Sequence, residues 1–105
     1  MRGDVCWADL GGRIGRRPVC VLTRDAAIDV LTAITCAPIS RTIRGISSEV
    51  VIGIDEGLNE ECVISCDNIV TIPKSAVASG RVGTLSPRKR AQLDAALRYS
   101  LDIRY

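Results

Sequence analysis

The sequence predicts a small, mostly antiparallel β-barrel with one α-helix packed on it. Short apolar segments rich in β-branched residues recur at close spacing between turn residues over positions 4–85. The one long stretch with helical periodicity lies at the C-terminus, where Leu93, Leu97 and Leu101 recur every four residues. The length of 105 residues fits one small core, so we expect a single domain over 1–105.

The N-terminal part contains three strand candidates. The first spans Asp4–Asp9, and the glycines at positions 11, 12 and 15 predict a loop after it. The continuously apolar run 18–23 is typical of a strand buried on both faces. A polar connector over 24–29, long enough for one helical turn, leads to a β-branched strand over 31–39 that Pro38 stops or bends.

The C-terminal part alternates short strands with polar loops. Strands are predicted at 49–54, 62–66 and 70–72, and the loops between them at 40–48 and 55–61. Asp67 and Asn68 form a turn signal between the last two of these strands. A helical turn at 74–78 and a short strand at 81–85 follow. Ser86 suits an N-cap and Pro87 the first helical position, which predicts a helix over Pro87–Leu101.

Composition limits the chemistry that this chain can perform. The net charge is only +2, yet 12 of the 14 basic residues are arginine, whose planar donor fork suits phosphate. The absence of histidine removes the most common general base and metal ligand, and the carboxylates do not cluster, so we expect no metal and no cofactor. The 47% of hydrophobic residues fits a buried dimer interface and a well-filled monomer core equally well.

The cysteines and the start of the chain indicate a compartment. Three of the five cysteines lie in strand-like runs, and the opening MRGDVCWADL lacks the apolar stretch of a signal peptide. No apolar run approaches the ~20 residues of a membrane-spanning helix. We therefore expect a reduced, cytoplasmic protein with buried thiols and no membrane association.

Polar residues follow or precede the apolar strands where a phosphate could bind. Arg17 stands before Pro18, and a residue before proline is held extended, so its guanidinium is either aimed at a phosphate or left in solvent at a strand edge. Ser40 ends the strand at 31–39 and offers a hydroxyl donor, or bonds to its own backbone. Asp67 and Asn68 could serve the same site or simply cap their turn.

Three blocks of sequence resemble the MazF/PemK family of toxin endoribonucleases. They are GRRPVCVLT at 15–23, APISRTIRG at 37–45 and ECVISCDNIVTIPKS at 61–75, and the opening MRGDVCWADL resembles the first strand of that family. The resemblance covers nearly the whole chain. It implies an SH3-like (PemK/MazF-like, CcdB-like) barrel, a homodimer, and neutralisation by an acidic, MazE-like antitoxin. It also implies metal-independent, sequence-specific cleavage of single-stranded RNA that leaves 2′,3′-cyclic phosphate and 5′-hydroxyl ends.

The resemblance also assigns site residues. Arg17 falls at the catalytic arginine of the family, and Ser40 stands where the family usually has threonine, with Thr42 as the alternative hydroxyl. Asp67 is a candidate base or a residue that orients Arg17. In some relatives an arginine stands two residues before this aspartate, and here that position is Ser65. Candidate catalytic residues are therefore Arg17, Ser40 and Asp67, and candidate RNA contacts are Arg16, Arg41, Thr42, Arg44 and Asn68.

Two other functions stay open at this stage. A toxin of the same fold could poison DNA gyrase by protein binding through its C-terminal helix, without hydrolysing RNA. A non-enzymatic SH3-like interaction domain is the other alternative. The positions of Arg17 and Ser40 favour the nuclease.

Overall fold

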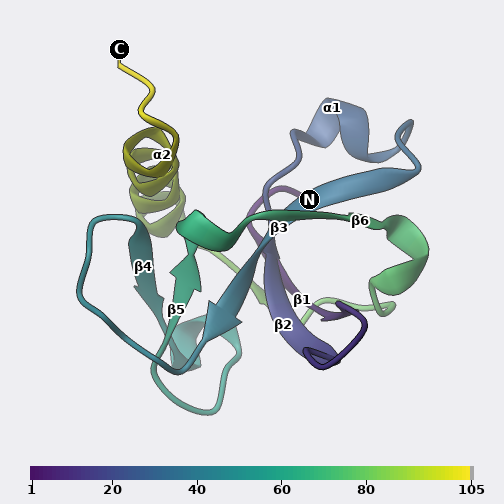
Figure 1. Ribbon diagram of the computed structural model, residues 1–105, viewed down its shortest axis with the longest axis horizontal. Coiled ribbons are helices and arrows are strands. Elements are labelled where there is room, and N and C mark those ends of the chain that lie inside the picture. The colour runs from purple at the N-terminus through teal and green to yellow at the C-terminus, as the bar shows by residue number, and fades with distance from the viewer. Residues whose placement is uncertain (105) are drawn as a thin grey trace.

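The computed structural model, which describes residues 1–104, has the predicted fold class. Seven antiparallel strands form a curled sheet, a half-barrel, and the C-terminal helix stands beside β4 and β5 (Figure 1). The strands are β1 Asp4–Asp9, β2 Arg16–Val21, β3 Ala33–Ser40, β4 Glu49–Ile52, β5 Cys62–Ser65, β6 Val70–Pro73 and β7 Gly83–Thr84. The helices are α1 Asp25–Ile28 and α2 Pro87–Leu101, with single 3₁₀ turns η1 Ile54–Glu56, η2 Cys66–Asn68 and η3 Lys74–Ala76.

Local sequence signals placed several elements correctly. The strand β1 and the helix α2 have the predicted bounds, and the helical turns predicted at 24–29 and 74–78 are confirmed as α1 and η3. Ser86 caps α2 as expected, because its Oγ accepts a hydrogen bond from the backbone N–H of Lys89 at 3.2 Å.

The predicted start of the second strand was wrong by two residues. The strand β2 begins at Arg16, because β1 extends to Asp9 and its last residues pair with the arginines: Asp9 with Arg16, and Ala8 with Arg17. Pairing of β2 with β3 begins only at Val19. The two arginines are therefore held by backbone pairing to β1 and project from a regular strand, not from a loop end.

The strand β3 brings distant segments together. Its first four residues pair with β6, and its last two, Ile39 and Ser40, pair with β5. The turn η2 joins β5 to β6 and therefore packs beside β3. This arrangement places Asp67 and Asn68 near the end of β3, although they are more than 25 residues away along the chain.

The apolar residues form two buried clusters. One lies between the sheet and α2 and includes Ile64, Leu85 and Leu93, each at most 1% exposed. The other contains Val19 and Ile34. All five cysteines are buried and free, as predicted for a reduced protein. Burial raises the pKa of Cys20 to about 12 and those of Cys36 and Cys66 to about 11, so these thiols are packing groups and not nucleophiles.

Candidate active site

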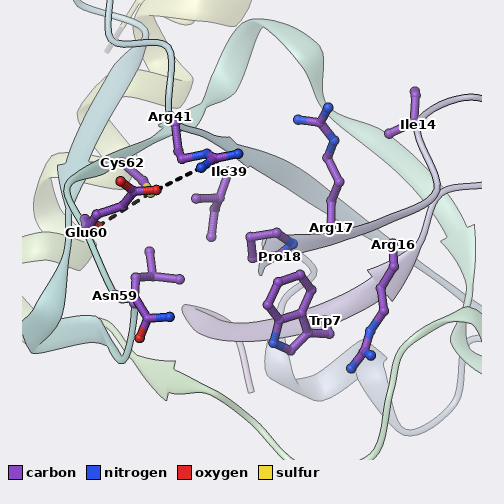
Figure 2. A pocket seen from close by; sticks show the side chains of 11 residues that line it. Trp7, Ile14, Arg16, Arg17, Pro18, Ile39, Arg41, Asn59, Glu60 and Cys62 are labelled. Carbon is purple, nitrogen blue, oxygen red and sulfur yellow. Dashed lines mark hydrogen bonds and ion pairs between the residues drawn. The ribbon is translucent and has the colours of Figure 1, made fainter.

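The guanidinium of Arg17 is available for a ligand. Its side chain is exposed, and it makes no hydrogen bond or ion pair with any residue in the described range 1–104. Figure 2 shows Arg17 and its neighbour Arg16 pointing to different sides of β2, as successive strand residues do. An unpaired arginine on a rigid strand can meet an anionic group without first breaking a contact.

Arg17 lies where two hollows in the surface meet. The first hollow, of about 660 Å³, contains six of the eight predicted site residues: Arg17, Ser40, Thr42, Arg44, Asp67 and Asn68. The second hollow, of about 460 Å³, contains the other two, Arg16 and Arg41, and shares Arg17 with the first. The fold therefore gathers the predicted residues from β2, the end of β3, the loop 41–48 and η2.

Ser40 has the geometry of a fixed hydroxyl donor. Its Oγ accepts a hydrogen bond from the backbone N–H of Thr42 at 3.0 Å, so the expected bond to its own backbone is present. That bond uses a lone pair of the oxygen and leaves the hydroxyl proton free to donate. The hydroxyl of Thr42 lies on the same hollow and is exposed.

The loop 41–48 is held in place by the carboxylate of Glu49, a residue that no sequence pattern singles out. One oxygen of Glu49 accepts hydrogen bonds from the backbone N–H groups of Arg44 and Gly45, both at 3.0 Å. Gly45 has a φ of 69°, a backbone conformation that favours glycine. Glu49 thus fixes the backbone beneath Arg44, while the Arg44 guanidinium extends toward the first hollow.

Asp67 anchors this loop to the C-terminal helix. Its carboxylate accepts hydrogen bonds from Ser48 Oγ at 2.6 Å and Ser100 Oγ at 2.9 Å. These two bonds hold the pKa of the Asp67 carboxyl below its ordinary value, so the group is ionised at neutral pH. Within residues 1–104 Asp67 forms no hydrogen bond or ion pair with Arg17, so it does not orient that guanidinium by direct contact.

The remaining predicted residues have modest contacts. The amide of Asn68 donates to Ser65 Oγ at 2.9 Å. Arg41 forms an exposed ion pair with Glu60 at 3.2 Å. Among residues 1–104 no group of three or more cysteine or acidic side chains could hold a metal ion. In the same range no helix is long and apolar enough to cross a membrane.

The fold and the site together define a class of protein. A curled antiparallel sheet with a terminal helix presents unpaired arginines, a fixed hydroxyl and an anchored basic loop on one surface, which suits a ligand that carries phosphate. Such a set of groups binds and stabilises a phosphate by charge and hydrogen bonding.

Comparison with known proteins gives the family. The family described as "PemK-like, MazF-like toxin of type II toxin-antitoxin system" matches residues 1–101. The chain therefore belongs to this family of toxin endoribonucleases. It is 38% identical over 87 residues to endoribonuclease MazF3 of Mycobacterium tuberculosis, which covers 83% of this chain and 84% of that protein.

Solved structures agree with this membership. The M. tuberculosis toxin MazF-mt6 superimposes with a TM-score of 0.90 at 34% identity, covering 97% of this chain and 99% of that one. An endoribonuclease from a mycobacterial species, solved in complex with its cognate antitoxin, matches with a TM-score of 0.87 at 24% identity, covering 100% and 97%. A gyrase-poisoning toxin, the alternative function, is not favoured by these comparisons.

Proposed function

We propose that this chain is a single-domain toxin that cleaves single-stranded RNA in the first hollow, with Arg17 and Ser40 as its catalytic residues. One observation carries the proposal. The unpaired guanidinium of Arg17 and the hydroxyl of Ser40, which is fixed in position and has a free proton, line the same hollow. Both are donors of the kind that stabilise negative charge on a phosphate. Single-stranded RNA suits the site because it supplies a 2′-hydroxyl beside each phosphate.

The reaction is an in-line transesterification, in which the 2′-oxygen of a ribose attacks the phosphorus of the phosphodiester on the same sugar. The 2′-oxygen forms a bond to phosphorus as the bond to the 5′-oxygen of the next nucleotide breaks. The 2′-hydroxyl passes its proton to solvent water and the leaving 5′-oxygen takes a proton from water, which yields a 2′,3′-cyclic phosphate and a 5′-hydroxyl. Arg17 and Ser40 donate hydrogen bonds to the non-bridging oxygens as their negative charge increases. A guanidinium stays protonated in proteins, so Arg17 acts as a donor and not as a base.

Asp67 fits better as a positioning residue than as the base. Its carboxylate already accepts bonds from Ser48 and Ser100, and its lowered pKa makes it a weak proton acceptor. The role that its contacts support is to hold the loop 41–48, and with it Thr42 and Arg44, against the rest of the site. A catalytic role for Asp67 remains the alternative that kinetics can decide.

The other predicted residues bind the substrate. We assign Thr42, Arg44 and Asn68 to RNA contacts in the first hollow, and Arg16 and Arg41 to RNA contacts in the second. Arginines on a groove attract the phosphate backbone whatever the base sequence. They provide affinity and register, while the base sequence is read by other groups.

The expected partners follow from the same surface. An acidic antitoxin would compete with RNA for these arginines, and an antitoxin complex is known for the mycobacterial relative described above. A homodimer is supported by apolar side chains left exposed on α2 and β4, including Tyr99, Leu101 and Val51, which are 65%, 51% and 42% exposed. The five buried, free thiols support the predicted cytoplasmic location.

Cleavage by the purified protein in excess EDTA tests the proposal. We expect single-stranded RNA to be cut at defined positions, with 2′,3′-cyclic phosphate and 5′-hydroxyl ends, at a rate that the chelator does not change. RNA that stays intact would contradict the proposed function. Activity that disappeared with the chelator and returned with Mg²⁺ would contradict the metal-free mechanism.

A further inference from the structure

The second hollow has features that the cleavage chemistry does not need. It is bounded on one side by Trp7 and Pro18 and on the other by Asn59 and the Arg41–Glu60 pair (Figure 2). Its volume of about 460 Å³ lies within the usual range for small-ligand sites, roughly 300–1,000 Å³. Of these residues only Arg41 was singled out from the sequence.

We propose that the second hollow binds one nucleobase of the RNA, that of a nucleotide adjacent to the scissile phosphate. Trp7 and Pro18 form the stacking wall and Asn59 contacts the edge of the base. The inference rests on the proposed function, because Arg17 lines both hollows and would hold the phosphate between them. A nucleotide attached to a phosphate at Arg17 is therefore next to the second hollow.

The stacking wall presents an aromatic ring on the exposed face of β1. Trp7 is the only tryptophan of the chain and is 37% exposed, whereas the residues on either side of it in β1, Cys6 and Ala8, are buried. Its cross-strand partner on β2 is Pro18, and the guanidinium of Arg16 lies 5.1 Å from the centre of the indole ring. The cation–π contact restrains the ring, and Pro18 lies beside Trp7 on the neighbouring strand. An exposed, fixed aromatic ring next to arginines is typical of sites that stack unpaired bases.

The facing wall provides hydrogen-bonding groups for the edge of a base. The amide of Asn59 is exposed and has no hydrogen-bond partner within residues 1–104, so both its donor and its acceptor are free. An amide presents a donor and an acceptor side by side, which matches the donor–acceptor pattern on a base edge. The Arg41–Glu60 pair is exposed on both sides, with side chains 79% and 56% accessible, and such pairs contribute little and open easily. Glu60 and Arg41 can therefore also turn toward a bound base.

The charge of the hollow favours a nucleotide over a neutral apolar ligand. Arg16, Arg17 and Arg41 line it against the single carboxylate of Glu60. The apolar part of the lining consists of Trp7, Pro18, Cys62 and the aliphatic side chains of Ile14, Ile39 and Leu58. This combination of one flat apolar surface, a free amide and excess positive charge matches a base attached to a phosphate.

Fluorescence of Trp7 tests the inference, since no other tryptophan contributes to the signal. The probe is an oligonucleotide that contains the cleavage site mapped for the wild-type protein, with a 2′-deoxy sugar at that site so that it binds without being cut. We expect this probe to quench the fluorescence. Removing the base on one side of the scissile phosphate, by an abasic substitution, should abolish the quenching and weaken binding by about 10–100-fold.

Variants separate the stacking wall from the edge contact. Trp7→Leu should lower kcat/KM by about 10–100-fold, the range expected for the loss of one base–aromatic stack. Asn59→Ala should change the preference among the four bases at that position. Val30→Ala serves as the control, because Val30 is an exposed apolar residue that lines neither hollow, and it should leave both properties unchanged. Should Trp7→Leu fail to fold, the abasic probe and Asn59→Ala still provide the test on folded protein.

The outcomes distinguish this inference from the proposed function. If the wild-type protein cuts RNA, but abasic probes on either side of the scissile phosphate bind and quench like the intact probe, the nucleobase site is wrong and the nuclease stands. Unchanged base preference in Asn59→Ala would remove the edge contact. If the wild-type protein does not cut RNA, the proposed function itself fails. Quenching by an acidic antitoxin peptide and never by RNA would assign the hollow to the antitoxin instead.

Discussion

The substitution Asp67→Asn separates two roles that one carboxylate could play, accepting a proton and anchoring a loop. Asparagine keeps one carbonyl oxygen, which can still accept from Ser48 Oγ. Its NH₂ can donate to Ser100 Oγ, whose own proton can go to the backbone oxygen of Cys66, 2.8 Å away. The anchoring network therefore survives the substitution, while the ability to accept a proton is lost.

The two roles predict different magnitudes. A general base contributes about 10²–10⁴ to a rate, so its removal would cost that factor in the chemical step. An anchor whose hydrogen bonds are replaced should cost less than about tenfold, and we expect this smaller effect because the lowered pKa of Asp67 makes it a weak base. Ser48→Ala should behave in the opposite way. It keeps the carboxylate, releases the loop, and weakens RNA binding more than it slows the chemical step.

Single-turnover cleavage rates and RNA dissociation constants for the two variants make the comparison. A titration of Asp67 in Ser48→Ala should show its pKa returning toward the ordinary value, since the hydrogen bond from Ser48 is the largest cause of the lowering. A loss of about 10²–10⁴ in the rate of Asp67→Asn, with RNA binding intact, would refute the anchoring role and make Asp67 the base.

Three further predictions concern binding, stability and assembly. Arg44→Ala should weaken RNA binding and reduce its dependence on salt, measured as the slope of affinity against ionic strength, with a smaller effect on single-turnover cleavage. Burial raises the pKa values of Cys20, Cys36 and Cys66 above the ordinary thiol value of 9.0, so their contribution to stability is complete below that pH and is lost as the pH rises toward 11–12; thermal melts should show a Tm that falls as the pH rises over this range. Light scattering at micromolar concentration should give twice the monomer mass of 11.3 kDa, and a monomer mass throughout would count against the dimer.

The sequence predicted the fold well where the signals were local. The bounds of α2 could be set because its cap, its proline and its apolar spacing all lie within the segment itself. The start of β2 could not, because Arg16 and Arg17 become strand residues only through their pairing with Asp9 and Ala8. Pairing energy from a neighbouring strand overrides the local preference of a polar segment.

The site could be predicted only in part for the same reason. Arg17 and Ser40 adjoin apolar strands, so their positions were visible in the sequence. The partners of Asp67 were not, because Ser48 and Ser100 are 19 and 33 residues from it. Glu49 closes a short loop, yet nothing in the local sequence distinguishes a carboxylate that binds backbone N–H groups from one in solvent.

The second hollow shows the same limit. Strand pairing places Trp7 and Pro18 side by side, and Asn59 faces them from a loop more than 40 residues further along the chain. The free amide and the exposed ring are ordinary residues in the sequence. Only the curl of the sheet places them around one hollow.

The central claim is that Arg17 stabilises the charge that develops on the phosphate. The single-turnover cleavage rate of Arg17→Ala, measured in excess EDTA beside wild type and Arg17→Lys, tests it most directly. We predict a loss of about 10²–10³ for alanine, the size expected when one donor to a developing oxyanion is removed, with RNA binding changed far less. Lysine should restore only part of the rate, because an ammonium lacks the bidentate fork. A rate for Arg17→Ala within a few-fold of wild type would contradict the account and leave Arg17 as an ordinary exposed residue of β2.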